Sequence, residues 1–155
     1  MNIQRLISFL GHTSNSDELM DFLSECGIKQ QPKGDSVTRV RSKDKKISLE
    51  FDLTETYLKE NPRQPVGSGW FTFSSVDVYP EAEADLPFGL SFKLPKAEVD
   101  ALLGKSFDNA EKKVQKYYKE DCLVIVFFNE TKTGVDIFRF KKPDKYNIES
   151  MNIGR

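Results

Sequence analysis

The sequence is poor in the residues from which most catalytic and metal sites are built. It holds one histidine and two cysteines among 155 residues. A structural zinc site takes four cysteine or histidine ligands and a serine protease triad needs an oriented histidine, so both are nearly excluded. We therefore expect no catalytic residue, no metal site and no cofactor, and a protein that binds rather than reacts.

An excess of charge of one sign and a long apolar run are also missing. The chain has 23 Lys+Arg and 24 Asp+Glu, whereas domains dedicated to nucleic acids are usually strongly basic. No run of about 18 apolar residues could cross a membrane. The first residues, Met1 to Gly11, lack the apolar stretch and cleavage site of a signal peptide. We expect a cytoplasmic protein with no direct nucleic-acid partner and no membrane partner.

Aromatic residues are abundant, with 12 Phe and 5 Tyr. Such a chain is too apolar to be disordered, and its length fits one domain with a substantial core. Cys26 and Cys122 have no spacing that indicates a disulfide, so we expect buried free thiols that act as small apolar groups.

Helical spacing of apolar residues predicts three helices in this chain. These stretches end at Gly11, Gly27 and Gly104, because glycine readily adopts the left-handed conformation that closes a helix. Ser14 stands three residues before Asp17, which predicts an N-terminal cap for the second helix. Pro95 fits the first turn of the third. A further turn or short helix is expected around 54–60.

Alternation of apolar and polar residues predicts six strands. Their expected ranges are 37–41, 47–52, 70–79, 112–119, 122–128 and 134–140. In the third strand the apolar positions change parity between Phe73 and Val76, which predicts a bulge at Ser74-Ser75. The bulge would keep the apolar side chains on the core face and turn Trp70 and Asp77 to the opposite face.

The chain also resembles itself weakly at an offset of 77 positions. Gly27 matches Gly104, Val37 matches Val114, and the strand around Leu49 matches that around Val126. Helices followed by runs of strands indicate an α+β fold with an antiparallel sheet. We predict two weakly similar helix-plus-strand repeats, 14–79 and 88–140, that form one sheet packed by helices. Residues 1–140 would be a single domain and 141–155 a loosely held polar tail.

The strand 122–128 is apolar on both of its faces. One face would pack on the helices. The other must be covered by a further element of the chain or form an apolar surface for a partner. The sequence leaves both possibilities open.

Two clusters of opposite charge stand out from the balanced total. The hairpin at 39–46 has five basic residues and one acid, and is expected to form a solvated edge. The loop after the third strand is acidic and could contact a basic partner, together with the aromatic residues that precede it. The expected contact residues are Trp70, Asp77, Tyr79, Glu81, Glu83 and Asp85.

Other polar positions have simpler interpretations. His12 has no evident orienting carboxylate or nucleophile, so a surface loop is expected. Gly67-Ser68-Gly69 lacks the lysine and helix of a phosphate-binding loop and is expected to be a turn.

The segment from Gly89 to Gly104 contains Gly-Leu-Ser, then Glu-Val, then Leu-Leu-Gly. It resembles the helix-opening motif of α/β-repeat modules such as β-lactamase inhibitory proteins and small outer-membrane assembly lipoproteins, which bind other proteins. A longer frame is similar to bacterial proteins found beside polymorphic toxins. It includes Ser8-Phe-Leu-Gly, Ile47-Ser-Leu-Glu-Phe-Asp and Leu86-Pro-Phe-Gly-Leu-Ser-Phe.

This resemblance implies an immunity protein of a polymorphic toxin or contact-dependent growth inhibition system. Such a protein binds a cognate toxin, often a basic nuclease domain, and would neutralise it by occluding its active site. The resemblance carries over no functional residue. The alternatives are a non-enzymatic scaffold or assembly module of the same fold, and an enzyme, for which only unpaired candidate residues are present.

Overall fold

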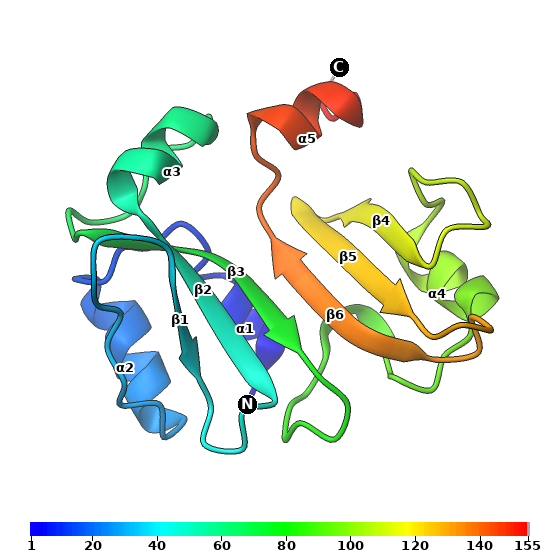
Figure 1. Cartoon of the computed structure of the whole chain (residues 1–155), viewed down its shortest axis with the longest axis horizontal. Helices are drawn as coiled ribbons and strands as arrows, with labels where there is room; N and C mark the ends of the chain where they lie inside the picture. Colours follow the sequence, from blue (N-terminus) through cyan, green and yellow to red (C-terminus); the bar gives the residue numbers. More distant parts are fainter. Residues whose placement is uncertain (155) are drawn as a thin grey trace.

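Six antiparallel strands form one sheet in the order β1-β2-β3-β6-β5-β4 (Figure 1). The structure is a computed structural model and describes residues 1–154. The strands are β1 (Thr38–Arg41), β2 (Ile47–Leu53), β3 (Phe71–Val78), β4 (Val114–Lys119), β5 (Cys122–Phe128) and β6 (Val135–Lys141). All five pairings between neighbours are antiparallel, so the predicted α+β fold with an antiparallel sheet is confirmed.

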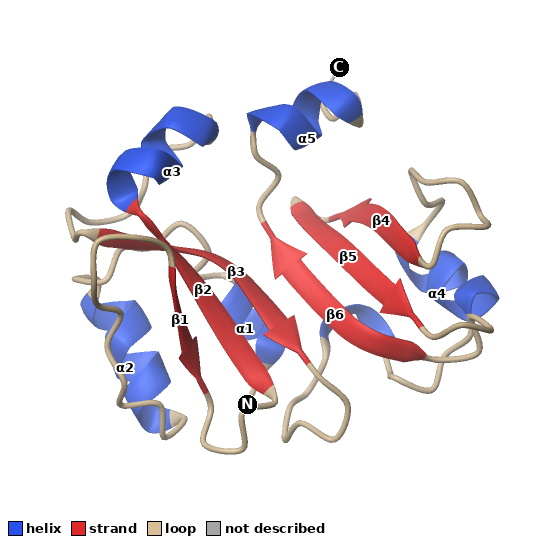
Figure 2. Ribbon diagram, in the orientation of Figure 1, coloured by secondary structure: helices blue, strands red, loops and turns tan. Residues whose placement is uncertain are grey.

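The helices lie behind this sheet and beyond one end of its strands (Figure 2). The helices α1 (Ile3–Ile7), α2 (Asp17–Glu25) and α4 (Lys96–Leu103) stand behind the strands, while α3 (Thr54–Glu60) and α5 (Lys145–Ser150) lie beyond one end of them. A single 3-10 turn, η1 (Pro87–Gly89), precedes α4. Within residues 1–154, no helix has the length and apolar composition needed to cross a bilayer.

Phenylalanine dominates the layer between the sheet and the helices. Five phenylalanines on the core face of the strands are fully buried: Phe51, Phe73, Phe128, Phe138 and Phe140. Leu19 of α2 and Val99 of α4 are also fully buried and belong to the same cluster. Burying such a side chain stabilises the fold by about 1.5–3 kcal/mol relative to leaving it exposed, so the helices are held through this layer.

The predicted bulge in β3 is present. Glu50 of β2 lies opposite Ser75, whereas the next residue, Phe51, lies opposite Phe73, so Ser74 is the extra residue. Because of this insertion, Phe73 and Val76 both point into the core, where each is fully buried.

The two halves of the chain repeat the same order of elements. The first runs α2, β1, β2, β3, with α3 inserted between β2 and β3, and the second runs α4, β4, β5, β6. The strands β3 and β6 pair at the centre of the sheet. Leu49 pairs with Val76 in the first half as Val126 pairs with Phe138 in the second. The residues after Val76 and Phe138 are Asp77 and Arg139, which face each other across the central pair. Asp77 and Arg139 therefore occupy equivalent places in the two halves.

The start of α2 differs from the prediction. Its N-cap is Ser16, whose hydroxyl accepts a hydrogen bond from the Leu19 backbone N–H at 3.4 Å, and not Ser14. Ser14 instead donates its own backbone N–H to the Phe71 carbonyl at 2.8 Å. Since Ser14 is engaged by the start of β3, the N-cap lies two residues after the predicted one.

The C-terminal segment is more ordered than predicted. The strand β6 continues through Lys141, and α5 follows with a capping box in which Asp144 and Asn147 bond each other's backbone N–H. Met151, beyond this helix, is buried. The stretch expected to be a loose polar tail thus contains a capped helix anchored by an apolar residue.

Candidate functional site

The face of the sheet turned away from α1, α2 and α4 is the main surface that the fold leaves uncovered (Figure 2). We call it the open face. Alternation along the strands determines which side chains point to it, because successive residues point to opposite sides. Its main members are Arg39 and Arg41 of β1, Ser48, Glu50 and Asp52 of β2, Ser75 and Asp77 of β3, Ile137, Arg139 and Lys141 of β6, Leu123, Ile125 and Phe127 of β5, and Val114, Lys116 and Tyr118 of β4.

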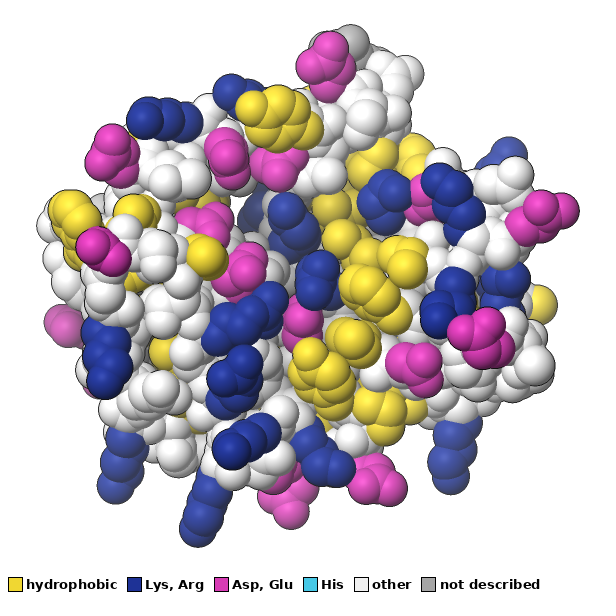
Figure 3. Space-filling model, viewed as in Figure 1, with side chains coloured by type: hydrophobic (Ala, Val, Ile, Leu, Met, Phe, Trp, Pro, Cys, Tyr) yellow, Lys and Arg dark blue, Asp and Glu magenta, His cyan; other side chains and the backbone are white. Residues whose placement is uncertain are grey.

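The open face is polar in one half of the sheet and apolar in the other. At equivalent positions of the second strand, the first half has Ser48 and Glu50, where the second half has Ile125 and Phe127. Apolar side chains accordingly gather over β5 and β6, with basic side chains beside them toward β3 (Figure 3). The boundary between the halves is the central pair of strands.

A buried ion pair occupies this boundary. The carboxylate of Asp77 is only 2% exposed and accepts two hydrogen bonds from Arg139, at 2.7 Å from Nε and 2.9 Å from Nη2. Arg39 approaches the same carboxylate at 3.6 Å and also contacts Glu50 at 3.2 Å. The hydrogen bonding that Arg139 donates to Asp77 raises the pKa of Arg139 and outweighs burial, which acts to lower it. Two guanidinium groups are thus fixed over one buried carboxylate.

The apolar half is partly covered by the protein itself. Leu123 is fully buried, whereas Ile125, Phe127 and Ile137 are half-buried. The guanidinium of Arg139 lies over the Phe127 ring, 5.1 Å from its centroid. The sequence left open whether the second face of the strand 122–128 is covered by the chain or forms an apolar surface. At Leu123 it is covered. The next two positions of β5 on that face remain accessible.

The structure does not bring the predicted contact residues together. Trp70, 61% exposed, precedes β3, and Tyr79, half-buried, follows it. Tyr79 is nine positions along the extended chain from Trp70, a distance of about 30 Å. Asp77 points to the open face, as predicted, but its burial beneath Arg139 and Arg39 corrects the expectation that it is an accessible acidic contact.

The acidic loop after β3 is accessible but anchored. Glu81, Glu83 and Asp85 are exposed. The N-terminal amino group of Met1 donates to the Glu83 carbonyl at 2.8 Å, and the backbone of Asp85 bonds to Met1 and Ile3. The N-terminal segment therefore fixes the path of this loop.

The basic hairpin and the acidic loop lie against each other. Lys46 contacts the Glu81 carboxylate at 3.2 Å, and its backbone carbonyl accepts the Tyr79 N–H at 2.9 Å. Ser42 and the Lys46 N–H both bond to Asp44, which lowers the pKa of that carboxyl. The two clusters of opposite charge that the sequence indicated are neighbours in the fold and neutralise each other in part.

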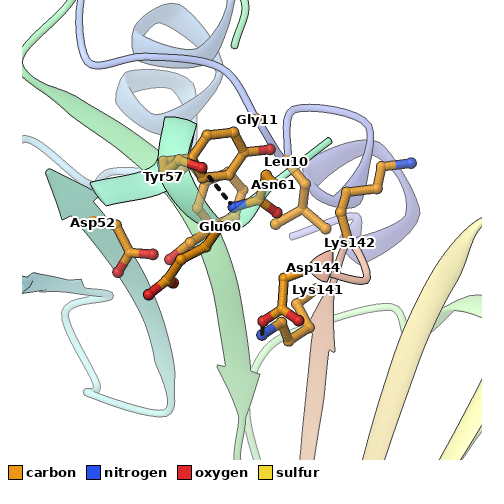
Figure 4. A pocket seen from close by; sticks show the side chains of 11 residues that line it. Leu10, Gly11, Asp52, Tyr57, Glu60, Asn61, Lys141, Lys142 and Asp144 are labelled. Atoms are coloured by element: carbon orange, nitrogen blue, oxygen red, sulfur yellow. Dashed lines mark hydrogen bonds and ion pairs between the residues drawn. The ribbon is translucent and has the colours of Figure 1, made fainter. Parts of the chain in front are cut away.

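A narrow pocket of about 30 Å³ lies where β3 and β6 diverge (Figure 4). Asp52 and the α3 residues Tyr57 and Glu60 line one side of it, and Lys141 and Asp144 line the other. Burial, followed by the nearby Glu50 carboxylate, raises the pKa of Asp52. A space of this size holds about one water molecule, so the pocket is too small for an organic substrate.

The remaining chemistry-bearing side chains have structural roles. The Nδ1 atom of His12 lies 2.9 Å from the Ser16 hydroxyl, and burial lowers the pKa of the ring. Burial raises the pKa of the Cys122 thiol to about 12, and Cys26 is a half-buried free thiol. No cluster of three or more possible metal ligands occurs in the described residues, 1–154.

Gly67-Ser68-Gly69, predicted to be a turn, is an irregular loop with a bend at Gly67, and it packs on the segment before α2. The Gly69 N–H donates to the Thr13 hydroxyl at 3.0 Å, and a Cβ on Gly69 would stand 2.8 Å from the Asn15 backbone nitrogen. This close approach explains the glycine without any bound phosphate.

Comparisons with known proteins give no family for this chain. No family matches it, and no curated protein matches its sequence. Among solved structures, it is similar to a cysteine-rich secretory protein from Staphylococcus aureus, with a TM-score of 0.45 and 15% identity. The match covers 88% of this chain and 44% of that protein, so the chain spans less than half of its length. Similarity at this level carries no information on function.

Proposed function

We propose that this chain is an immunity protein that binds and neutralises a cognate bacterial toxin by occluding its active site. The observation that supports a binding role is the open face, where one side of the sheet has no helical cover and keeps Ile125, Phe127 and Ile137 accessible. Apolar side chains that stay partly accessible and lie together on one surface are a feature of protein–protein contact sites. The toxin as partner comes from the resemblance in the sequence.

The open face is a better docking surface than the sheet edges. At the middle of the edge strand β4, the outward N–H of Lys116 donates to Asp108 at 2.7 Å and its carbonyl accepts from Phe107 at 2.9 Å. The other edge strand, β1, has four residues and two arginines, a composition that discourages strand addition. A partner would therefore meet side chains rather than free backbone groups.

A scaffold or assembly module that binds a cellular protein is the second candidate. The same open face would serve either role, and the two differ in the consequence of binding. An immunity protein abolishes the toxicity of its partner, whereas a scaffold leaves the activity of its partner intact.

Co-expression with the product of the gene directly upstream tests the proposal. We expect that this product stops growth when expressed alone, and that growth resumes and a stable complex forms when this chain is present. A product without toxicity, or a toxin that neither binds this chain nor is neutralised by it, would reject the proposal. Binding without any change in the partner's activity would favour the scaffold.

The acidic loop remains a predicted second contact, for a basic surface such as that of a nuclease domain. Reversal of Glu81, Glu83 and Asp85 to lysine would slow association with such a surface, because opposite charges accelerate encounter. An unchanged association rate would remove the loop from the interface. The sheet would stay intact in this variant, because the three side chains are exposed.

A further inference from the structure

The chemistry of the open face specifies what its partner must offer. We infer that the docking surface of the partner is an apolar patch of a folded protein bordered by carboxylates, with the apolar patch on Ile125, Phe127 and Ile137 and the carboxylates on Arg139 and its basic neighbours. This inference rests on the proposed function and adds the chemistry of the contact. It differs from the sequence-based expectation, in which the acids of this chain meet a basic partner.

The sign of the charge follows from which groups are accessible. The strand side chains of the open face include five bases and three acids: Arg39, Arg41, Lys116, Arg139 and Lys141 against Glu50, Asp52 and Asp77. Lys116 and Lys141 are paired with Asp108 and Asp144 at its margins, so the arginines supply the positive charge that a partner meets. The acid at the centre is hidden, because Asp77 is 2% exposed while the Arg139 side chain above it is 31% exposed. A partner that reaches the centre of the sheet therefore meets a guanidinium group.

Arg139 is already ordered for this contact. Two hydrogen bonds to Asp77 fix one edge of its guanidinium. The Phe127 ring lies under the guanidinium, with its centroid 5.1 Å from the central carbon Cζ. A guanidinium held in this way loses little side-chain freedom when it binds a carboxylate, and its remaining N–H groups are available as donors. Arg41 is exposed and extends the basic region along β1.

The apolar positions are neighbours in the sheet. Ile125 lies opposite Arg139, and Phe127 lies opposite Ile137, so the three apolar side chains adjoin the guanidinium directly. Ile125 and Ile137 offer no stacking platform for bases, and the Phe127 ring lies under the Arg139 guanidinium. The chain also has a net charge of −1. These features favour a protein surface over a nucleic acid as the occupant.

Titration calorimetry with the purified upstream gene product as the probe tests this inference. Ile137→Glu places a charge in the apolar patch and should weaken binding about 100-fold. Arg41→Glu, an exposed reversal, should weaken binding about 3- to 10-fold and reduce its dependence on salt. The matched control is Lys29→Glu, which is exposed beyond the end of α2, on the helical side, and should bind as the wild type does.

A paired variant examines Arg139 without leaving a buried charge alone. Arg139→Gln combined with Asp77→Asn removes both charges at once and should weaken binding about 10-fold or more. Circular dichroism spectra that match the wild type would confirm that each variant is folded. If the double variant does not fold, the Arg41→Glu and Ile137→Glu variants test the inference, because both positions lie outside the ion pair.

The outcomes separate this inference from the proposed function. If the upstream product is bound and neutralised equally by wild type, Ile137→Glu and Arg41→Glu, docking occurs elsewhere and the inference is wrong, while the immunity function stands. Tighter binding by Arg41→Glu would show a basic partner surface and also overturn it. Binding of a 20-nucleotide single-stranded DNA probe that Arg41→Glu abolishes would identify nucleic acid as the occupant and reject the protein partner.

Discussion

Asp77 is the residue on which the open face depends most. Its carboxylate is buried at the centre of the sheet, where an unpaired charge would be strongly unfavourable. Arg139 and Arg39 offset this cost by pairing with it. Its partner Arg139 occupies the equivalent place in the other half of the chain. The pair therefore joins the two halves and at the same time presents a guanidinium to the surface.

Asp77→Ala should lower the free energy of unfolding by about 3 kcal/mol, because it leaves Arg139 and Arg39 without their shared carboxylate. The matched control is Glu81→Ala, which breaks an ion pair whose acid is 86% exposed and should cost less than about 1 kcal/mol. Urea unfolding followed by circular dichroism measures both. Equal losses for the two variants would show that the Asp77 pair contributes no more than a surface contact.

Ionised Asp52 should destabilise the fold, unlike ionised Asp77, because the surroundings of Asp52 disfavour its charged form. Burial and the Glu50 carboxylate raise the pKa of Asp52 above its ordinary value of 3.8, so the folded chain holds the proton more tightly than the unfolded chain. Its contribution to stability therefore falls as the pH rises from 3.8 through the folded-state pKa.

Asp52→Asn should accordingly be more stable than the wild type at pH 7, by up to about 1 kcal/mol. The difference should disappear below pH 3.8, where both states of the wild type are protonated at this position. Urea unfolding at a series of pH values measures it. A gain that is constant with pH would show that ionisation of Asp52 is not its cause.

The strand β3 shows at the scale of one element how the sequence encodes the sheet. Its apolar residues change parity at Ser74, and the extra residue restores them to the core. Deletion of Ser74 should turn Phe71 and Phe73 to the open face and prevent stable folding, since a one-residue slip reverses every side chain beyond it.

Ser74→Ala is the matched control for this deletion. It removes one hydrogen bond, from the hydroxyl to the Glu50 carbonyl at 3.2 Å, and should cost about 1 kcal/mol. Circular dichroism and thermal unfolding compare the two variants. A deletion variant as stable as Ser74→Ala would mean that the bulge does not set the register.

Elements with a strong local pattern were predictable and contacts between distant segments were not. Alternation of apolar and polar residues predicts the six strands, and Gly27 and Gly104 predict the ends of α2 and α4. The short helix α5 was missed, although Asp144 and Asn147 have the spacing of a capping box. The pairing of Asp77 with Arg139 depends on the register of β3 against β6, which no local pattern specifies. The length of β3 does predict, from the sequence alone, that Trp70 and the acidic loop lie at opposite ends of the strand.

For the whole molecule, the scarcity of histidine and the balanced charge conceal an uneven surface. The described helices are concentrated on one side and at one end, and the open face divides into a charged half and an apolar half along the central strands (Figure 3). The acidic loop lies elsewhere, fixed by the N-terminal segment and paired in part with the basic hairpin. The chain therefore presents two candidate contact surfaces, and the open face is the one that combines fixed charge with apolar area.

Isoleucine methyl NMR on the wild-type chain tests this account most directly. Ile125 and Ile137 lie on the open face, whereas Ile3 bonds through its backbone to the acidic loop and Ile28 is buried on the helical side. On titration with the upstream gene product, we predict that the methyl signals of Ile125 and Ile137 shift or broaden while that of Ile28 stays unchanged. Changes confined to Ile3, with Ile125 and Ile137 unaffected, would contradict docking on the open face.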